Sequence, residues 1–522
     1  MPGFHIEHFG CRAARADGEA VSGRLRAAGL CEREPAAADV VIVNTCSVTA
    51  EADRAARAFI RRAHRLNPAA RIVVTGCYAQ RAPEELAGLD GVAAVVGNSH
   101  KALAPEIILG LTASRIGVDP AHPQGLVGVE SLLAGGAKAP VWADDRFEHS
   151  FIEEAQLTPG AQTRPNLKIQ EGCGNRCTFC VIPWTRGSSK SLPAASVLRQ
   201  VERFVAAGGN ELVLSGINLG RWGRDLPSAA AGEADGGSPF PTLSAKGGGK
   251  DGARSFCGKA STLAGLVREI LERTGLPRLR LSSIEPMDWD AELLALMTEF
   301  GGTRLARHAH LPLQSGSDAV LRRMHRRYRP WHYAEKVAAL VRAAGPELTV
   351  GADVMVGFPG ETDGEFEETL EMVRALPLGY LHLFPFSPRP GTRGWALHAE
   401  SPVAAAMVEE RMGALRALAA EKSRAHREQF VGRALEAITL HTPAALAELG
   451  RTAALTENFL PVEVEGCWPA NRLARVRVTK LNEEGTLEAC LAGDQYEAGV
   501  MSVRPRSVPL KSNSSPVSLA SA

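Results

Sequence analysis

The sequence predicts a multidomain α/β protein. An N-terminal doubly wound parallel α/β domain precedes a central partial (β/α) barrel and a small C-terminal β-barrel. The chain of 522 residues is too long for one hydrophobic core, and its 45% hydrophobic content can fill several. Short apolar runs alternate with amphipathic helical patterns up to about residue 400, and short β patterns follow the last long helical pattern.

Residues 1–135 form the first predicted domain. Short β-rich runs at 4–9, 38–45 and 71–76 are separated by helical patterns, and this βαβαβ order predicts a parallel, doubly wound sheet. The following stretch, at about 111–162, is rich in Gly, Pro and Ala, which is typical of a linker.

Residues 160–400 form the second predicted domain, in which repeated β/α units favour a full or partial barrel. Its candidate strands are NLKIQ, ELVLSGI, RLRLSSI, HAHLPL, ADVMVGF and YLHLFPF. Residues 227–261 interrupt this alternation with a non-periodic, Gly- and Ser-rich composition, which predicts a flexible surface insertion.

A long helical pattern at 404–431 connects the second domain to the third. Residues 430–506 contain four short β patterns, which predict a small β-barrel. Residues 507–522 are expected to form a disordered tail.

Charge and the N-terminal sequence exclude several classes of protein. Lys+Arg (59) and Asp+Glu (58) nearly cancel, so any nucleic-acid contact must use local basic patches. The N-terminus lacks a signal-peptide pattern, and no apolar run approaches the roughly 20 residues of a membrane span. We therefore expect a cytoplasmic protein with no membrane partner. Its ten cysteines are then reduced, and they serve metal binding or catalysis rather than disulfides.

Three cysteines with the spacing C-x3-C-x2-C follow the predicted strand NLKIQ: Cys173, Cys177 and Cys180. Three thiolates can hold three irons of a cubane iron–sulfur cluster and leave the fourth iron open to a substrate or cofactor. The loop follows the carboxyl end of a strand, which is the active face of barrel enzymes. These are the predicted catalytic cysteines, and a zinc site completed by a distant His is the alternative.

A second set of cysteines, Cys11, Cys46 and Cys77, follows three predicted strands of the first domain at intervals of about one βαβ unit. The carboxyl ends of parallel strands meet at one edge of a sheet and line its ligand crevice. We therefore expect the three thiols to converge and to hold a second cluster with an open iron. Three small buried cysteines without a ligand are the alternative.

These two triads and their flanking motifs resemble the methylthiotransferases of the radical S-adenosylmethionine (SAM) superfamily. The resemblance covers about residues 4–506 and implies two [4Fe-4S] clusters, SAM as cofactor and a C-terminal RNA-binding barrel called TRAM. It also implies an electron donor such as flavodoxin or ferredoxin, and it leaves the sulfur donor open. The matching motifs are VNTCSVT, VVTGCYAQ, KIQEGCGNRCTFCVIPWTRG, LSSIEP, HLPLQSG, DVMVGFPGET and FSPRPGT.

The family acts on adenosine 37 of tRNA or on an aspartate of a ribosomal protein. The stretches IRRAHRLNPAARIVVTGCYAQ and KIQEGCGNRCTFCVIP are most similar to the branch that adds a methylthio group to C2 of N6-threonylcarbamoyladenosine in tRNA. The alternatives are the N6-isopentenyladenosine branch, the ribosomal-protein branch and an RNA-binding protein with structural or redox clusters. A cobalamin-binding first domain is disfavoured because its strands end in cysteine.

The resemblance implies that further motif residues lie near SAM or the substrate. They are Ser215, Gly216, Ser283, Glu285, Gln314, Ser315, Gly357, Gly360 and Glu361. Polar residues and glycines at strand ends are also common turn formers, and this is the alternative for each of them. Two basic segments, 321–333 and 471–480, are expected to contact RNA, and solvated faces with ordinary ion pairs are the alternative.

Overall fold

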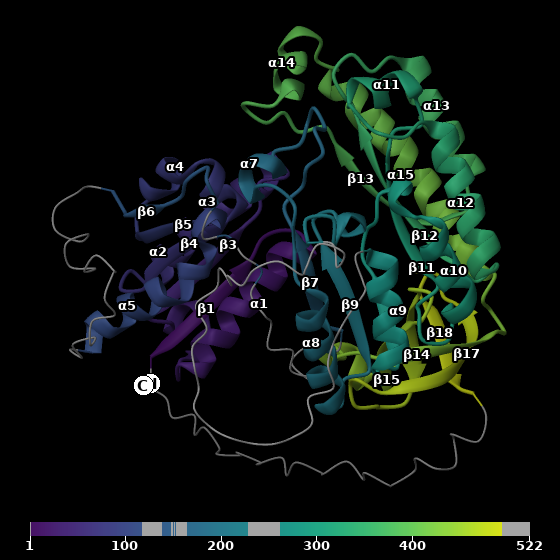
Figure 1. The fold of residues 1–522 in the computed structure, drawn as a ribbon, viewed down its shortest axis with the longest axis horizontal. Helices are drawn as coiled ribbons and strands as arrows, with labels where there is room; N and C mark the ends of the chain where they lie inside the picture. Colours follow the sequence, from purple (N-terminus) through teal and green to yellow (C-terminus); the bar gives the residue numbers. More distant parts are fainter. Residues whose placement is uncertain are drawn as a thin grey trace, which may run out of the picture.

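The computed structural model describes residues 2–116, 138–147, 150, 152, 164–227 and 262–492. Most of the expected linker at 111–162, the expected insertion beyond residue 227 and the expected tail at 507–522 lie outside these residues. A parallel α/β domain, a larger α/β domain and a small β-barrel follow one another along the chain (Figure 1). The predicted fold class is confirmed.

The N-terminal domain is built on a six-stranded parallel sheet with the strand order β2-β1-β3-β4-β5-β6. Its central strands are apolar on both sides because helices cover both faces: α1 and α5 pack on one face, and α2, α3 and α4 on the other. The strands are Gly3–His8 (β1), Cys31–Glu32 (β2), Val40–Thr45 (β3), Arg71–Gly76 (β4), Val92–Gly97 (β5) and Val141–Trp142 (β6). The helices are Arg12–Ala27 (α1), Ala50–Leu66 (α2), Cys77–Arg81 (α3), Pro83–Ala87 (α4) and Ala104–Ile116 (α5).

The central domain is a partial barrel made of two sheets, with the orders β10-β9-β7-β8 and β11-β12-β13. One continuous core of buried apolar residues spans both sheets and their outer helices. The strands are Asn166–Glu171 (β7), Lys190–Ser191 (β8), Glu211–Gly216 (β9), Arg278–Leu281 (β10), His308–Gln314 (β11), Thr349–Val356 (β12) and Leu378–Pro385 (β13). The helices are Ile182–Arg186 (α7), Ala194–Ala206 (α8), Leu263–Arg273 (α9), Ala291–Phe300 (α10), Asp318–Arg323 (α11), Pro330–Ala344 (α12), Asp363–Ala375 (α13), Arg393–Glu400 (α14) and Ala405–Glu428 (α15).

The strands of the central domain place apolar residues outward and polar residues inward. On β11, Leu311 and Leu313 belong to the core beneath the helices, so the alternate positions His308, His310 and Gln314 face the barrel interior. The interior therefore presents polar side chains to a ligand, while the apolar positions hold the barrel together.

The C-terminal domain is a closed barrel with the strand order β14-β15-β16-β18-β17. Its hairpin between β15 and β16 contacts the central domain: Arg307 donates to the carboxylate of Glu457 at 2.9 Å, and the Asn458 amide donates to the Glu347 carbonyl at 3.0 Å. No described helix is long and apolar enough to cross a membrane. The elements are Ala434–Thr439 (β14), Ala444–Glu448 (α16), Arg451–Thr456 (β15), Pro461–Glu465 (β16), Leu473–Leu481 (β17) and Leu487–Leu491 (β18).

Candidate active site

The loop that carries Cys173, Cys177 and Cys180 begins directly after β7, at the carboxyl edge of the barrel. Gly172 makes the turn with a φ of 69°, and a Cβ atom there would lie 2.0 Å from the carbonyl oxygen of Ser188. The Cys173 backbone N–H donates to the Gly187 carbonyl at 3.1 Å, which ties the start of the loop to the chain that follows it.

We expect Gly172→Ala to impair assembly of the cluster at this loop. The added methyl group would meet a backbone oxygen and force a strained φ, so the loop must shift. Iron content and the cluster absorbance after anaerobic reconstitution should fall relative to Gly174→Ala, a matched substitution in open space with an ordinary φ. Equal iron content in the two variants would contradict this role for Gly172.

The three thiols lie beside a cavity of about 590 Å³, which also borders Trp184 and Arg393. Burial raises the pKa of Cys173 and raises that of Cys180 to about 12. Thiols in this environment need a cationic partner to ionise, and iron supplies such a partner. The donor set and the adjoining cavity therefore fit an iron–sulfur cluster with a small-molecule ligand.

Polar groups donate hydrogen bonds to the sulfurs of this triad. The Asn218 amide approaches the Cys173 sulfur at 3.5 Å, and the Arg326 guanidinium approaches the Cys177 sulfur at 3.3 Å. Arg326 also donates to Glu285 at 2.6 Å, which places the predicted residue Glu285 next to the cysteine loop. Such donors stabilise thiolate charge.

The RNA-contact prediction for 321–333 does not hold for several members of that segment. Arg326, Tyr328 and Tyr333 are buried and hydrogen-bond to groups inside the barrel, including the Leu311 carbonyl. Trp331 is exposed and stays available for contact with a partner.

The second triad lies at neighbouring strand ends of the N-terminal sheet, as predicted. Cys11 follows β1, Cys46 follows β3 and Cys77 begins α3 directly after β4. A Cβ atom on Gly10 would lie 2.6 Å from the Cys46 Cβ, so the segment between β1 and Cys11 passes too close to Cys46 for any residue but glycine. Burial raises the pKa of Cys46 to about 12, and the nearby charges of Cys77 and Cys11 act in the same direction.

Exposure differs among the thiols of the second triad. Cys46 and Cys77 are buried whereas Cys11 is exposed, so one side of the second triad is open.

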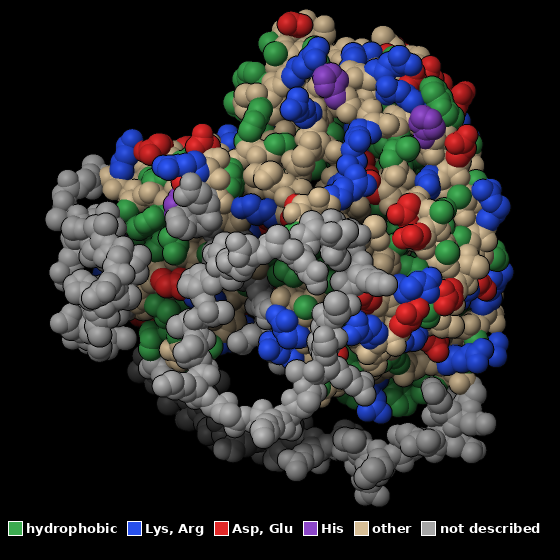
Figure 2. All heavy atoms as spheres, in the orientation of Figure 1, with side chains coloured by type: hydrophobic (Ala, Val, Ile, Leu, Met, Phe, Trp, Pro, Cys, Tyr) green, Lys and Arg blue, Asp and Glu red, His purple; other side chains and the backbone are tan. Residues whose placement is uncertain are grey.

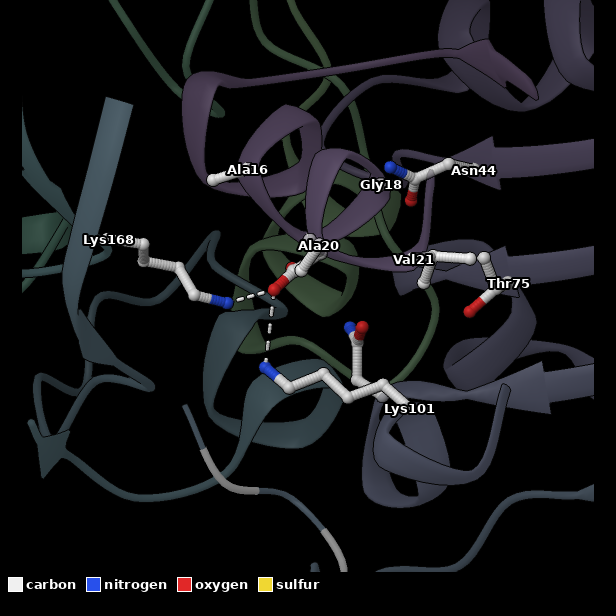
Figure 3. A pocket seen from close by; sticks show the side chains of 10 residues that line it. Ala16, Gly18, Ala20, Val21, Asn44, Thr75, Lys101 and Lys168 are labelled. Carbon is white, nitrogen blue, oxygen red and sulfur yellow. Dashed lines mark hydrogen bonds and ion pairs between the residues drawn. The ribbon is translucent and has the colours of Figure 1, made fainter. Parts of the chain in front are cut away.

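A cluster of five charged side chains, four of them buried and Asp17 partly buried, links the two triads: Asp17, Lys101, Lys168, Glu171 and Arg186. Arg186 ends α7, donates to Asp17 and Glu171 at 2.9 and 2.8 Å, and also donates to the Cys77 sulfur at 3.2 Å. Lys101 and Lys168 both donate to Asp17 Oδ1. Figure 3 shows the two lysine side chains turned toward each other. Although burial alone would raise it, the pKa of Glu171 stays well below its usual range because Arg186, Lys101 and Lys168 surround the carboxylate.

Sequence reasoning missed this charge cluster because its members come from α1, the segment after β5, β7 and α7. The motif WTRG contains Arg186, but nothing in its spacing indicates a contact with Cys77. α7 packs against α3 and therefore joins the cysteine loop of the barrel to the cysteine edge of the N-terminal sheet (Figure 1).

The predicted residues of the motif DVMVGFPGET form a buried turn. Glu361 accepts from the Gly357 N–H at 2.8 Å and from the Arg411 guanidinium at 2.9 Å, and the Gly360 N–H donates to the Ser401 carbonyl at 2.8 Å. These bonds give Glu361 a positioning role, and its contact with SAM stays a prediction.

Two other predicted residues offer buried polar atoms to the barrel interior. The Ser215 hydroxyl and the Gln314 side-chain carbonyl have no hydrogen-bond partner among the described residues, so they fit a polar ligand such as SAM. Gly216 ends β9 next to Ser215, and Ser283 is half-buried after β10. Ser315 instead hydrogen-bonds Thr369 at 3.0 Å, as a turn-forming residue does.

Comparisons with known proteins match both halves of this site. Residues 3–97 match the family described as Uncharacterized protein family UPF0004, and residues 167–373 match the Radical SAM superfamily. The "Threonylcarbamoyladenosine tRNA methylthiotransferase MtaB" of Bacillus subtilis is 33% identical over 480 residues, which cover 91% of this chain and 93% of that protein. The "tRNA-2-methylthio-N(6)-dimethylallyladenosine synthase" of Geobacter metallireducens is 32% identical over 398 residues, which cover 75% of this chain and 77% of that protein.

A solved structure has a similar fold over most of the chain. The radical S-adenosylmethionine methyltransferase TsrM from Kitasatospora setae, with cobalamin and a [4Fe-4S] cluster bound, gives a TM-score of 0.51 at 17% identity. The match covers 77% of this chain and 78% of that chain. At this identity the similarity concerns the fold alone.

Proposed function

Because the chain belongs to the methylthiotransferase family of radical SAM enzymes, we propose that it adds a methylthio group to C2 of N6-threonylcarbamoyladenosine at position 37 of tRNA. The observation that carries the proposal is the pair of cysteine triads and their connection through Arg186. Arg186 donates to Cys77 of one triad and ends α7, the helix that follows the cysteine loop of the other. The name of the Bacillus subtilis relative supports the threonylcarbamoyl branch, and the name of the Geobacter metallireducens relative keeps the isopentenyl branch as the second candidate.

The enzyme uses SAM and [4Fe-4S] clusters as cofactors. We assign Cys173, Cys177 and Cys180 to the cluster that binds SAM, and Cys11, Cys46 and Cys77 to the auxiliary cluster. When bound, SAM and its cluster supply one-electron chemistry, which suits a C2–H bond of no useful acidity.

The surrounding residues hold this machinery in place. Asn218 and Arg326 donate to the sulfurs of the first triad, and Arg186 donates to Cys77 of the second. The Arg186 ion pairs with Asp17 and Glu171 join the two domains across their interface. The chain therefore fixes the separation of the two triads, which a transfer between them requires.

We assign tRNA binding in part to the exposed face of β17 in the C-terminal barrel, which we regard as TRAM-like. Val476 and Val478 are buried while Arg475 and Arg477 are exposed, so the strand alternates core and basic positions. On the face drawn in Figure 2, basic and acidic side chains are interspersed, so RNA affinity depends on such local groups rather than on net charge.

We expect the double variant Arg475→Gln/Arg477→Gln to bind tRNA more weakly and with less salt dependence. Loss of two phosphate contacts should lower the slope of log affinity against log salt by about 1 to 2. The matched control is Arg342→Gln, an exposed arginine on α12. Titration of labelled tRNA at several salt concentrations measures both slopes, and identical slopes would remove β17 from the interface.

Mass spectrometry of tRNA nucleosides tests the proposed reaction. A host that lacks its own enzyme should gain 2-methylthio-N6-threonylcarbamoyladenosine when it expresses this chain. The isopentenyl analogue would change the branch, and no new nucleoside from an iron-loaded protein would favour a ribosomal-protein substrate. A flavodoxin or ferredoxin donor and a cytoplasmic location stay predictions.

A further inference from the structure

Three ionisable side chains meet on the inner face of the last three barrel strands: His310 of β11, Asp353 of β12 and His382 of β13. Asp353 and His382 are register partners, and His310 lies two positions before Pro312, the partner of Asp353 on β11. The Asp353 Oδ1 lies 3.2 Å from His310 Nε2 and 3.2 Å from His382 Nδ1.

The hydrogen-bonding capacity of these three side chains is not used up within the protein. His310 is only 8% exposed, yet its Nε2 has no hydrogen-bond partner among the described residues, because its approach to Asp353 lacks hydrogen-bond geometry. The His382 side chain is 61% exposed, so this histidine forms the open end of the cluster. His310 Nε2 pairs with Asp353 at 3.2 Å without a well-formed hydrogen bond, and this spare capacity next to an open histidine favours a polar ligand at this point.

Arg12 brings a positive charge to the same wall of the barrel. It follows Cys11 directly, and its guanidinium lies 5.9 Å from the ring centre of Phe459. The Arg12 side chain is exposed, and within the described ranges its guanidinium makes no hydrogen bond or ion pair. The Phe459 ring lies 5.5 Å from Tyr380, which lies 5.2 Å from His382, so Arg12 and His382 flank one aromatic surface.

The position of this surface suits a group attached to N6 of adenine. Arg12 directly follows Cys11 of the auxiliary triad, and His310 lies on β11, four residues before Gln314 at the carboxyl end of that strand. In adenine only N1 separates C2 from C6. A base with C2 between the triads would therefore bring its N6 substituent close to its reacting carbon, in the interior that these strands line.

The chemistry of the surface matches a carboxylate with adjacent hydroxyl and amide groups. A guanidinium without a partner binds a carboxylate in a bidentate manner, and Asp353 can accept from a hydroxyl or N–H while the histidines complete the contacts. An isopentenyl group offers no donor or acceptor to these polar groups, and it would leave the buried His310 without a polar ligand. We propose that Arg12, His382, Asp353 and His310 bind the anionic N6 substituent of the substrate and set the choice between the two nucleosides. This inference rests on the proposed function.

Binding of three anticodon stem–loop RNAs to the reconstituted full-length enzyme tests the proposal. The RNAs differ only at position 37, which carries N6-threonylcarbamoyladenosine, N6-isopentenyladenosine or adenosine. We expect Arg12→Gln and His382→Phe each to weaken binding of the threonylcarbamoyl RNA by about 10- to 100-fold, the usual effect of a lost charged hydrogen bond. Binding of the adenosine RNA should not change, and KM should rise more than kcat falls.

Two further variants separate recognition from folding. His382→Asn keeps a polar group and should retain part of the preference, whereas Arg65→Gln, an exposed arginine at the end of α2, should behave as the wild type. Iron content and cluster absorbance must match the wild type in every variant that is compared.

The outcomes are distinct. If the wild type prefers the threonylcarbamoyl RNA and both variants keep that preference, or lose affinity equally for all three RNAs, only this inference is overturned. If the wild type prefers the isopentenyl RNA, the proposed function and this inference both fail. If the wild-type enzyme binds one equivalent of zinc and the Asp353→Asn variant binds none, the cluster is a metal site and the proposal is overturned.

Discussion

Replacing Cys177 with alanine is expected to abolish SAM cleavage, whereas replacing Cys46 with alanine is expected to spare cleavage and stop methylthiolation. Each variant removes one thiol of one triad, so each disables one cluster. The two triads lie in separate domains with separate cores, and the loss of one cluster therefore leaves the other in place.

Two anaerobic assays measure this contrast. Chromatography of methionine and 5′-deoxyadenosine follows SAM cleavage by the reduced enzyme, and mass spectrometry of tRNA nucleosides follows methylthiolation. Cys467→Ala is the matched control, because that thiol is exposed in the C-terminal barrel far along the chain from both triads. Normal cleavage and normal modification by both cysteine variants would refute the assignment of two clusters.

Replacing Arg186 with methionine is expected to lower thermal stability and to remove about half of the bound iron. The guanidinium is fully buried, and its loss deprives Asp17 and Glu171 of a cation and Cys77 of a donor. Removal of one partner from a buried ion-pair network costs about 3–5 kcal/mol. Since the contact with Cys77 is lost, the auxiliary cluster is the one expected to be depleted.

Iron analysis, cluster absorbance and the midpoint of thermal unfolding test the Arg186 variant. The control is Arg268→Met, which breaks only exposed ion pairs with Glu272 and Glu299 and should leave the midpoint and the iron content unchanged. SAM cleavage by Arg186→Met should persist at a temperature where the variant is folded. Full iron content in Arg186→Met would show that the guanidinium does not support the auxiliary cluster.

The two cysteine triads could be predicted from the sequence because each depends on local order along the chain. Cys173, Cys177 and Cys180 lie in one loop, and their spacing alone brings them together. Cys11, Cys46 and Cys77 lie far apart, but parallel strands joined by helices must align their carboxyl ends, so the βαβ period predicts their convergence. The alternation of basic and apolar residues at 471–480 could also be predicted, because successive side chains of a strand point to opposite faces.

The polar residues around the triads could not be assigned in this way. In the basic segment 321–333, Arg326 is buried against Cys177 while Trp331 is exposed, and composition cannot distinguish a buried arginine from a solvated one. Glu361 and Ser315 stand in motifs that predict a ligand site, yet their side chains bond to Arg411 and Thr369 within the protein.

The sequence by itself determined the fold class, the two triads and the family, because periodic patterning and short-range spacing carry that information. Only the tertiary structure decided which charges are buried together. Asp17, Lys101, Glu171 and Arg186 come from distant segments, and the contact of Arg12 with the barrel wall depends on how two domains pack. Such contacts follow from the mutual burial of whole surfaces, so no local pattern of residues predicts them.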